Sequence, residues 1–244
     1  MRDWKSEFEK RVQFVKDCLK DAHSFAIVYG NSGGKDCCLV SVICKAACSD
    51  TLGILMPCAS AINYTTDTED ALLAAKQFDI EQITVDLTAA REKIMENIEK
   101  SVKVLPAAAA NIAPRLRMTT LYTVAQSRGA LVAGTGNASE RYMGYFTKWG
   151  DGAYDFNPIA DLTVTEVYQF MDYLKIPRKI ITKVPSAGLY EGQTDEGEMG
   201  VSYAQIDAYM AGKRSEVEQK SREIIERYHK TTEHKRNLPK NYKE

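Results

Sequence analysis

The stretch "YGNSGGKDCCLV", residues 29–40, decides the fold, because two glycines and a Lys-Asp pair separate an apolar run from a helix of small residues. Free backbone N–H groups and the helix dipole favour an anion at such a helix start, and glycines let phosphate oxygens approach the backbone closely. We therefore interpret residues 30–37 as a phosphate-binding loop between a strand and a helix. A tight turn that uses glycine only for its geometry is the alternative.

Two better-known phosphate loops do not fit this stretch. A Walker loop requires Gly-Lys followed by Ser or Thr, whereas the chain has Gly34-Lys35-Asp36, with Tyr29 where the first glycine should stand. The dinucleotide pattern GxGxxG is also absent, because "GTGNAS" at 134–139 ends in Ser. The stretch is instead similar to the SGGxDS loop of enzymes that release pyrophosphate from ATP, except that Cys37 replaces the last Ser.

Short apolar runs and helical patterns alternate around this loop. The runs lie at 25–30, 52–57, 82–87 and 130–136, and the helical patterns at 37–48, about 67–78, 88–101 and 114–128. This order predicts an α/β fold with a doubly wound parallel sheet, which binds ligands at the carboxyl ends of its strands.

The second half of the chain has a weaker pattern. It predicts one helix at 163–175, a loop at 184–200 that contains Gly and Pro, and two further helical stretches. The alanines at 107–110 predict only an apolar approach to the next helix. Because no internal repeat or long linker divides the chain, we predict a single domain over residues 1–244.

Composition excludes several classes of protein. Hydrophobic residues make up 44% and charged residues 27%, as in ordinary globular proteins, and the net charge of -1 gives no reason to expect nucleic-acid or membrane binding. No apolar run approaches the ~18 residues of a membrane span, and the charged N-terminus is not a secretory signal. The six cysteines form no CxxC pair, which is typical of reduced thiols, so we expect a cytoplasmic protein.

Five further motifs indicate a family. They are "NIAPRLRMTTLY" (111–122), "GTGNASERYMGYFTKWGDGAYDFNPIADL" (134–162), "KVPSAGL" (183–189), "QTDEGEMGVSY" (193–203) and "HKR" (234–236). Together with the loop, and in this order and spacing, they resemble ammonia-dependent NAD synthetases from about residue 25 to residue 236. The resemblance implies the adenine nucleotide α-hydrolase-like (Rossmann-like) fold and a homodimer with its substrate site at the interface. It also implies the ATP-dependent amidation of deamido-NAD to NAD by ammonia through an NAD-adenylate, with Mg²⁺ as the metal.

The resemblance also assigns roles to single residues. Asp36, Ser32 and Thr135 would be catalytic, and Asp36 and Glu140 would bind Mg²⁺, which prefers a few carboxylate oxygens together with phosphates and water. The residues expected to bind ATP are Gly30, Asn31, Ser32, Gly33, Gly34, Lys35, Asp36, Cys37, Thr135 and Ser186. The residues expected to bind deamido-NAD are Arg115, Lys148, Asp155, His234 and Lys235, with Lys148 reaching the site of the partner subunit.

Taken alone, some of these residues have simpler interpretations. Asp36 would be a helix N-cap, and "TTEHKRNLPK" a solvated basic tail. Proline is tolerated in the first turn of a helix, so Pro114 in place of the family's usual Ala still leaves Arg115 near the start of its helix. Because the synthetase unit uses the whole chain, we expect no glutaminase domain, and free ammonia as the nitrogen source.

Two departures from the family keep other functions open. Val164 stands where the family has a phosphate-contacting lysine, and Cys37 is a weak hydrogen-bond donor. We hypothesise that Lys35, the nearest new cation in sequence, takes over the phosphate contact. One alternative is a divergent paralogue that forms another amide or thio product after adenylation, such as a tRNA thiolase, although the chain lacks a CxxC pair and a basic RNA-binding face. The other is a catalytically dead nucleotide-binding regulator.

Overall fold

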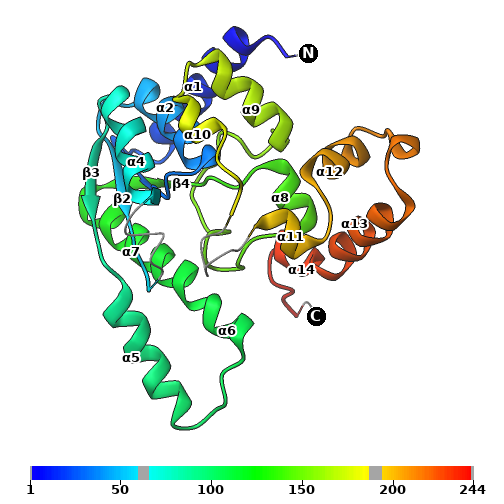
Figure 1. The fold of residues 1–244 in the computed structure, drawn as a ribbon. Helices are drawn as coiled ribbons and strands as arrows, with labels where there is room; N and C mark the ends of the chain where they lie inside the picture. Colours follow the sequence, from blue (N-terminus) through cyan, green and yellow to red (C-terminus); the bar gives the residue numbers. More distant parts are fainter. Residues whose placement is uncertain (1, 60–65, 187–193, 243–244) are drawn as a thin grey trace.

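A parallel sheet of four strands forms the centre of the molecule (Figure 1). The computed structural model describes residues 2–59, 66–186 and 194–242. The strands, in the spatial order β3-β2-β1-β4, are β1 (Ala26–Gly30), β2 (Thr51–Leu55), β3 (Glu81–Thr84) and β4 (Ala130–Ala133). Every pairing between them is parallel, which confirms the predicted doubly wound α/β fold.

Neighbouring residues of a strand point to opposite faces of the sheet. Apolar side chains therefore emerge on both faces, and helices cover both. Ile27 and Tyr29 of β1 pack in one apolar cluster with helices α1, α2, α4 and α9, whereas Val28 packs in a second cluster with α7. The helices are α1 (Trp4–Asp21), α2 (Lys35–Ala47), α4 (Thr66–Gln77), α7 (Ile112–Arg128) and α9 (Val164–Tyr173). The buried run of β1 therefore supplies two hydrophobic cores.

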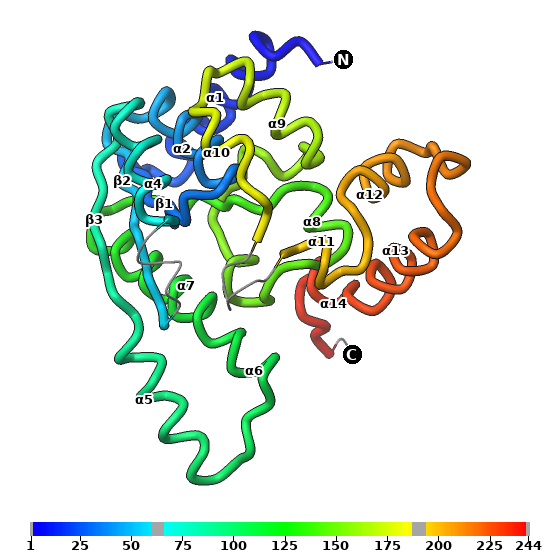
Figure 2. The backbone as a smooth tube through the Cα atoms, in the orientation of Figure 1, coloured from blue at the N-terminus to red at the C-terminus, as the bar shows by residue number. Residues whose placement is uncertain are grey.

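Two helices project from this body. Helix α5 (Thr88–Glu99) and the short helix α6 (Pro106–Ala110) contain no buried residues, and Figures 1 and 2 show them extending below the sheet. Proline is favoured in the first turn of a helix, which explains the start of α6 at Pro106. The sequence-based interpretation of residues 107–110 as a mere approach to the next helix was wrong, because they form a helix of their own directly before α7.

Helix α8 and the helices that follow residue 194 form a helical lobe beside the sheet (Figure 1). A third apolar cluster holds this lobe together, and it includes Val164 as well as Met143 and Ile225. The elements of the lobe are α8 (Ala138–Met143), α11 (Asp195–Met199), α12 (Tyr203–Met210), a 3₁₀ turn (Arg214–Glu216), α13 (Gln219–Thr231) and α14 (Glu233–Arg236). The short helix α10 (Arg178–Ile181) instead packs in the first apolar cluster through Ile180. Residues 187–193 of the predicted loop at 184–200 lie outside the described residues.

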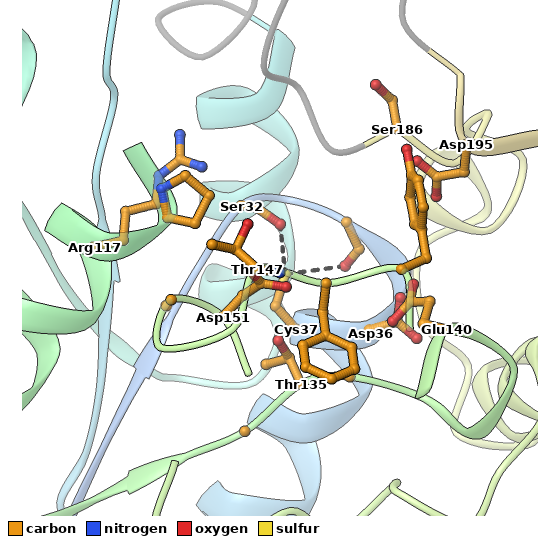
Figure 3. Close-up of a pocket in the computed structure, with 18 of the residues that line it drawn as sticks. Ser32, Asp36, Cys37, Arg117, Thr135, Glu140, Thr147, Asp151, Ser186 and Asp195 are labelled. Carbon is orange, nitrogen blue, oxygen red and sulfur yellow. Dashed lines mark hydrogen bonds between the residues drawn. The ribbon is translucent and has the colours of Figure 1, made fainter. Parts of the chain in front are cut away.

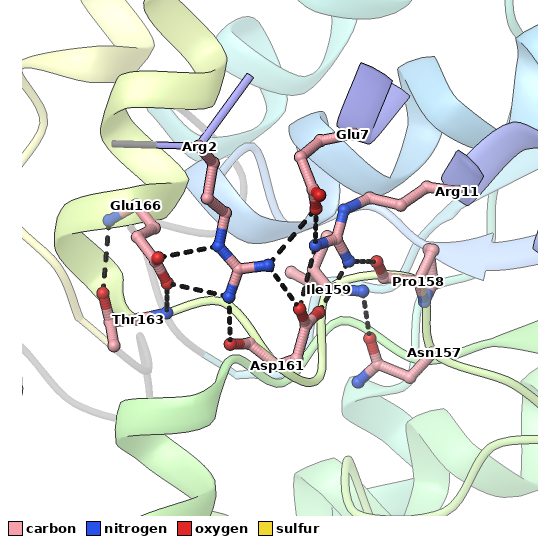
Figure 4. Close-up of polar contacts among 9 residues, drawn as sticks. All are labelled: Arg2, Glu7, Arg11, Asn157, Pro158, Ile159, Asp161, Thr163 and Glu166. Atoms are coloured by element: carbon pink, nitrogen blue, oxygen red, sulfur yellow. Dashed lines mark hydrogen bonds and ion pairs between the residues drawn. The ribbon is translucent and has the colours of Figure 1, made fainter. Parts of the chain in front are cut away.

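A charged network attaches the N-terminus to this framework (Figure 4). The Arg11 guanidinium donates to Asp161 at 2.6 and 3.0 Å and to Glu7 at 2.8 Å. Arg2 donates to Asp161 at 2.8 Å and to Glu166 at 2.8 Å. These contacts tie α1 to the segment that leads into α9.

The cysteines and the helices bear on two further expectations from the sequence. All six cysteines are free, and four of them (Cys37, Cys38, Cys44 and Cys58) are buried. Within the described parts of the chain, no helix is both long enough and apolar enough to cross a membrane.

Candidate active site

The site forms where the sheet reverses its strand order. From β1 the chain proceeds to β2 on one side, whereas β4 pairs with β1 on the other side. In such sheets ligands bind outside the carboxyl ends of the strands at this switch point. The phosphate loop follows β1, and Thr135 follows β4. The two segments therefore meet at one edge of the sheet.

The phosphate loop presents free helix-start N–H groups. Gly34 is the N-cap of α2 in an extended conformation, and no side chain caps that end of the helix. Asp36 lies inside the first turn, so its interpretation as an N-cap does not hold. The Ser32 side chain is exposed toward the cavity, so an anion can reach both its hydroxyl and the helix start.

Gly33 has a different task from its neighbours. It is buried with φ +70°, and a Cβ there would come within 2.3 Å of the Asp67 carbonyl oxygen in α4. Only glycine allows this close approach without strain. Asn31 adds a second link, because its Nδ2 donates to Gln82 Oε1 at 2.9 Å while its Oδ1 accepts the Gly33 N–H at 3.2 Å. These two residues hold the loop in place.

Cys37 turns its thiol back into the loop. The Sγ–H donates to the Gly34 carbonyl oxygen at 3.1 Å, and Sγ lies 3.4 Å from the Ser32 hydroxyl (Figure 3). Burial raises the pKa of this thiol. It therefore stays neutral and occupies the position of the family's Ser as a weak hydrogen-bonding group.

A cavity of about 750 Å³ opens above these elements, within the range of about 300–1,000 Å³ that is usual for ligand sites. With the exception of Gly33, every residue predicted to bind ATP lines it: Gly30, Asn31, Ser32, Gly34, Lys35, Asp36, Cys37, Thr135 and Ser186. Glu140 and Lys235 line it as well. The structure thus brings residues from distant parts of the sequence into one site.

Asp36 and Glu140 lie side by side at the cavity wall (Figure 3). Asp36 Oδ1 accepts from Asn137 Nδ2 at 3.1 Å, and Glu140 forms a capping box with Asn137 at the start of α8. Burial raises the pKa of Glu140, the charge of Asp36 raises it further, and the charge of Lys35 opposes both effects. Two carboxylates held this close together are both ionised only where a cation offsets their repulsion.

This pair fits Mg²⁺ better than it fits a metal that requires a full set of protein ligands. Among the described residues, no group of three or more His, Cys, Asp or Glu side chains could hold a metal ion. Mg²⁺ is usually bound through one or two carboxylates and completes its coordination with phosphates and water. The oxygen donors of Asp36 and Glu140 meet that requirement.

The five residues predicted to bind deamido-NAD lie in three different surroundings, of which Lys235 and the group around Lys148 are two. Lys235 lines the cavity, where its Nζ donates to the carbonyl oxygens of Gly144 and Phe146 at 2.8 Å each. Arg115, Lys148 and His234 form a chain of contacts: Arg115 Nη2 donates to the Lys148 carbonyl oxygen at 3.3 Å, and Lys148 Nζ to the His234 carbonyl oxygen at 2.7 Å.

Asp155 lies apart from these four residues. Its Oδ2 accepts from the Val132 backbone N–H at 2.7 Å, and its Oδ1 accepts from the Tyr122 hydroxyl at 3.3 Å. Lys148, which we expected to reach a partner subunit, contacts its own chain here. The roles of all five residues toward deamido-NAD stay predictions.

Sequence reasoning missed two further cations of the cavity. Lys183 Nζ pairs with Asp67 at 2.7 Å and Asp70 at 2.9 Å, which links the segment before Ser186 to α4. Arg117 Nε donates to the Met56 carbonyl oxygen at 3.2 Å, and burial lowers the pKa of its guanidinium. Both residues lie inside motifs that indicate the family. Their place in those motifs was the signal by which the sequence could have identified them as site residues.

Comparisons with known proteins agree over nearly the whole chain. The family model described as NAD synthase matches residues 7–239. The NH(3)-dependent NAD(+) synthetase of Carboxydothermus hydrogenoformans is 42% identical over 240 residues, which cover 97% of each chain.

Two solved structures resemble the fold closely. An NMN synthetase from Francisella tularensis superposes with a TM-score of 0.93 and 34% identity over 99% of each chain. An NH3-dependent NAD synthetase from Campylobacter jejuni superposes with a TM-score of 0.83 and 26% identity over 99% of this chain and 100% of that one.

Proposed function

The chain belongs to the NAD synthase family, and on that premise we propose that it forms NAD by joining ammonia to the nicotinate carboxylate of deamido-NAD, with ATP as the activating co-substrate. One observation carries this proposal. The cavity combines a phosphate loop, two adjacent carboxylates and several cations, which is what adenylation of an acid requires. The names of the curated relatives support ammonia as the nitrogen source.

The chemistry explains why ATP is needed. A carboxylate does not react with ammonia, because oxide would have to leave. In the first step a carboxylate oxygen bonds to the α-phosphorus of ATP, the bond from that phosphorus to the β-phosphate oxygen breaks, and pyrophosphate departs. In the second step the ammonia nitrogen bonds to the carbonyl carbon, the bond from that carbon to the AMP oxygen breaks, and a proton leaves the nitrogen. Both steps concentrate negative charge, which preorganised donors stabilise.

We assign the ATP-binding roles along the phosphate loop and its neighbours. Ser32, Gly34 and the start of α2 would bind the departing pyrophosphate, and Gly33 would keep the loop in position. The hydroxyls of Thr135 and Ser186 would contact ATP from the opposite walls. Asp36 and Glu140 would hold Mg²⁺, which neutralises phosphate charge as pyrophosphate leaves.

The second substrate would extend from the cavity, which Lys235 lines, toward Arg115, Lys148 and His234, which are not among the lining residues. We assign it to Arg115, Lys148, His234 and Lys235, with Asp155 at a separate point. A guanidinium fork such as that of Arg115 suits a carboxylate or a phosphate.

We further propose a homodimer in the cytoplasm, built from one synthetase domain per chain. The projecting helices α5 and α6 and the connection between them support the dimer, because Ile98 of α5 is 40% exposed and Val102 and Leu105 of the connection are 60% and 65% exposed. The free cysteines are in keeping with a reducing compartment. Sedimentation at assay concentration tests the dimer, and a fully active monomer would contradict it.

A second candidate substrate follows from the Francisella tularensis structure. Its title names an NMN synthetase, and its TM-score of 0.93 exceeds the 0.83 of the Campylobacter jejuni NAD synthetase. The acid that gives NMN is nicotinate mononucleotide, which carries the same reacting carboxylate but lacks the adenylate half of deamido-NAD. The reaction and the ATP site would be unchanged, and only the acid would differ.

Product analysis tests the proposal. With Mg²⁺ and ammonium, each acid is supplied separately, and kcat/KM is compared while AMP and pyrophosphate are counted. We expect AMP and pyrophosphate in equal amounts and a higher kcat/KM with deamido-NAD. A higher kcat/KM with nicotinate mononucleotide would select the second candidate. ADP as the main nucleotide product would contradict both, and nucleotide binding without pyrophosphate release would favour a regulator.

A further inference from the structure

The Lys35 ammonium lies against both carboxylates that we assign to Mg²⁺. Its Nζ is 2.7 Å from Asp36 Oδ2 and 3.7 Å from Glu140 Oε1. The Lys35 side chain is only 7% exposed, compared with 15% for Asp36 and 18% for Glu140. The ammonium therefore sits within the carboxylate pair instead of extending into solvent.

The surroundings keep this ammonium charged and in place. Nζ lies 5.5 Å from the centre of the Tyr203 ring, a distance at which the ring attracts a cation. The Tyr203 hydroxyl donates to Asp195 Oδ2 at 2.9 Å, which fixes the ring.

The two carboxylates come from different elements and would repel each other without a cation. Asp36 belongs to α2 and Glu140 to α8, and both helices begin at the switch point of the sheet. When both carboxylates are ionised, one ammonium supplies a single positive charge for two negative charges. A divalent cation would supply the second charge, but it would need the same oxygens.

We propose that Lys35 is a resident counterion of the Asp36–Glu140 pair, and that a divalent cation has to displace its ammonium in order to bind there. This inference rests on the proposed function, because the two carboxylates are metal ligands only on that assignment. It differs from the hypothesis that Lys35 contacts phosphate, since its ammonium pairs with carboxylates. The consequence is a site whose metal affinity is set by a neighbouring lysine.

Metal binding without turnover tests this inference. Mn²⁺ takes the same hard oxygen ligands as Mg²⁺, and its free form can be counted by electron paramagnetic resonance. We expect the Lys35→Met variant to bind Mn²⁺ at least about tenfold more tightly than the parent, because a competing positive charge a few ångströms away is gone. An unchanged or weaker affinity would overturn the inference.

A matched variant controls for the loss of a lysine. Lys183 also lines the cavity and also pairs with two carboxylates, Asp67 and Asp70. Because those acids are not assigned to the metal, Lys183→Met should change the Mn²⁺ affinity by less than about threefold. An equal gain in both variants would show a general charge effect and overturn the inference.

The Lys35→Met protein could fail to fold, because two partly buried carboxylates would be left without their cation. The double variant Lys35→Met/Glu140→Gln removes one charge of each sign, and the new amide can still accept the Asn137 N–H. We expect this double variant to melt at a higher temperature than Lys35→Met. If it melts no higher, the pairing is not what stabilises the ammonium, and the inference fails.

The two proposals fail in different ways. If the parent enzyme converts deamido-NAD to NAD but Lys35→Met gains no Mn²⁺ affinity, only the inference about Lys35 is wrong. If the parent enzyme makes no amide while Lys35→Met gains Mn²⁺ affinity, the proposed function is wrong and the counterion pair remains.

Discussion

At the scale of single residues, Cys37 shows how the loop accommodates a departure from the family. Its thiol makes the contacts that a hydroxyl could make, to the Gly34 carbonyl oxygen and the Ser32 hydroxyl. The other departure, Val164, is buried in the apolar cluster of the helical lobe. A lysine there would have to leave that cluster to reach phosphate.

We predict that Cys37→Ser keeps kcat/KM for ATP within about twofold of the parent, because the hydroxyl can donate to the same oxygen. Cys37→Ala should lower kcat/KM by about 2- to 10-fold, since it loses a neutral hydrogen bond of about 0.5–1.5 kcal/mol. Steady-state kinetics with varied ATP checks both. Equal losses in the two variants would contradict a hydrogen-bonding role for the thiol.

Sequence reasoning found the loop residues because they are adjacent in the chain, and their order alone carries the chemistry. It found neither Lys183 nor the anchoring role of Lys235. The partners of Lys183 stand at 67 and 70, and those of Lys235 at 144 and 146. Contacts between such distant positions depend on how the lobe packs, which no local pattern contains.

At the scale of elements, the central strands β1 and β2 were predictable because they are buried on both faces of the sheet. Every residue of β2 and four of the five in β1 are buried, so both strands appear in the sequence as continuous apolar runs. Helix α6 was not predictable in the same way. It has no buried residue and therefore no apolar periodicity to reveal it.

The segment from Thr232 to Arg236 is an anchor and not a solvated tail. Lys235 holds the carbonyl oxygens of Gly144 and Phe146, and Thr232 packs against Gly144, where a Cβ would come within 2.2 Å of its hydroxyl oxygen. These contacts fix the wall of the cavity formed by residues 144–147.

We predict that Lys235→Met lowers the melting temperature and raises KM for the acid substrate. A hydrogen bond from a charged donor contributes about 1.5–3 kcal/mol, and the half-buried Lys235 should lie at the lower end of that range. Thermal denaturation and kinetics check this prediction, with the exposed Lys240→Met as the control. Equal melting temperatures for the two variants would contradict the anchoring role.

Helix α1 is attached through Asp161, whose charge state gives a pH signature (Figure 4). Partial burial would raise the pKa of Asp161, but the hydrogen bonds and charges of Arg11 and Arg2 outweigh it and lower the pKa to about 2. The pKa of an aspartate in the unfolded chain is about 3.9. The carboxylate therefore stabilises the fold above that pH, and the gain disappears as the pH falls from about 4 to about 2.

We predict that Asp161→Asn lowers the melting temperature near neutral pH and that its difference from the parent shrinks below about pH 4. Thermal melts across pH check this, at low salt because the carboxylate is partly exposed. Asp172→Asn is the control, since the ion pair of Asp172 with Arg178 is exposed on both sides. A difference that stays constant with pH would contradict the assignment.

At the scale of the whole molecule, the sheet supplies the phosphate loop and the helical lobe supplies Glu140 and Lys235. The reaction needs both, because the acid must meet the α-phosphate while ammonia enters and water is kept out. The family match covers residues 7–239, so it spans both parts. We propose that this combined site transfers nitrogen from free ammonia to an activated nicotinate carboxylate.

Isotope-labelled ammonium tests that claim most directly. The enzyme is incubated with deamido-NAD, ATP, Mg²⁺ and labelled ammonium, and the products are identified by mass spectrometry. We predict NAD with the label in its carboxamide, formed in equal amount to AMP and pyrophosphate, and no NAD when glutamine free of ammonia replaces ammonium. AMP and pyrophosphate without labelled amide, or equal rates with glutamine, would contradict the account.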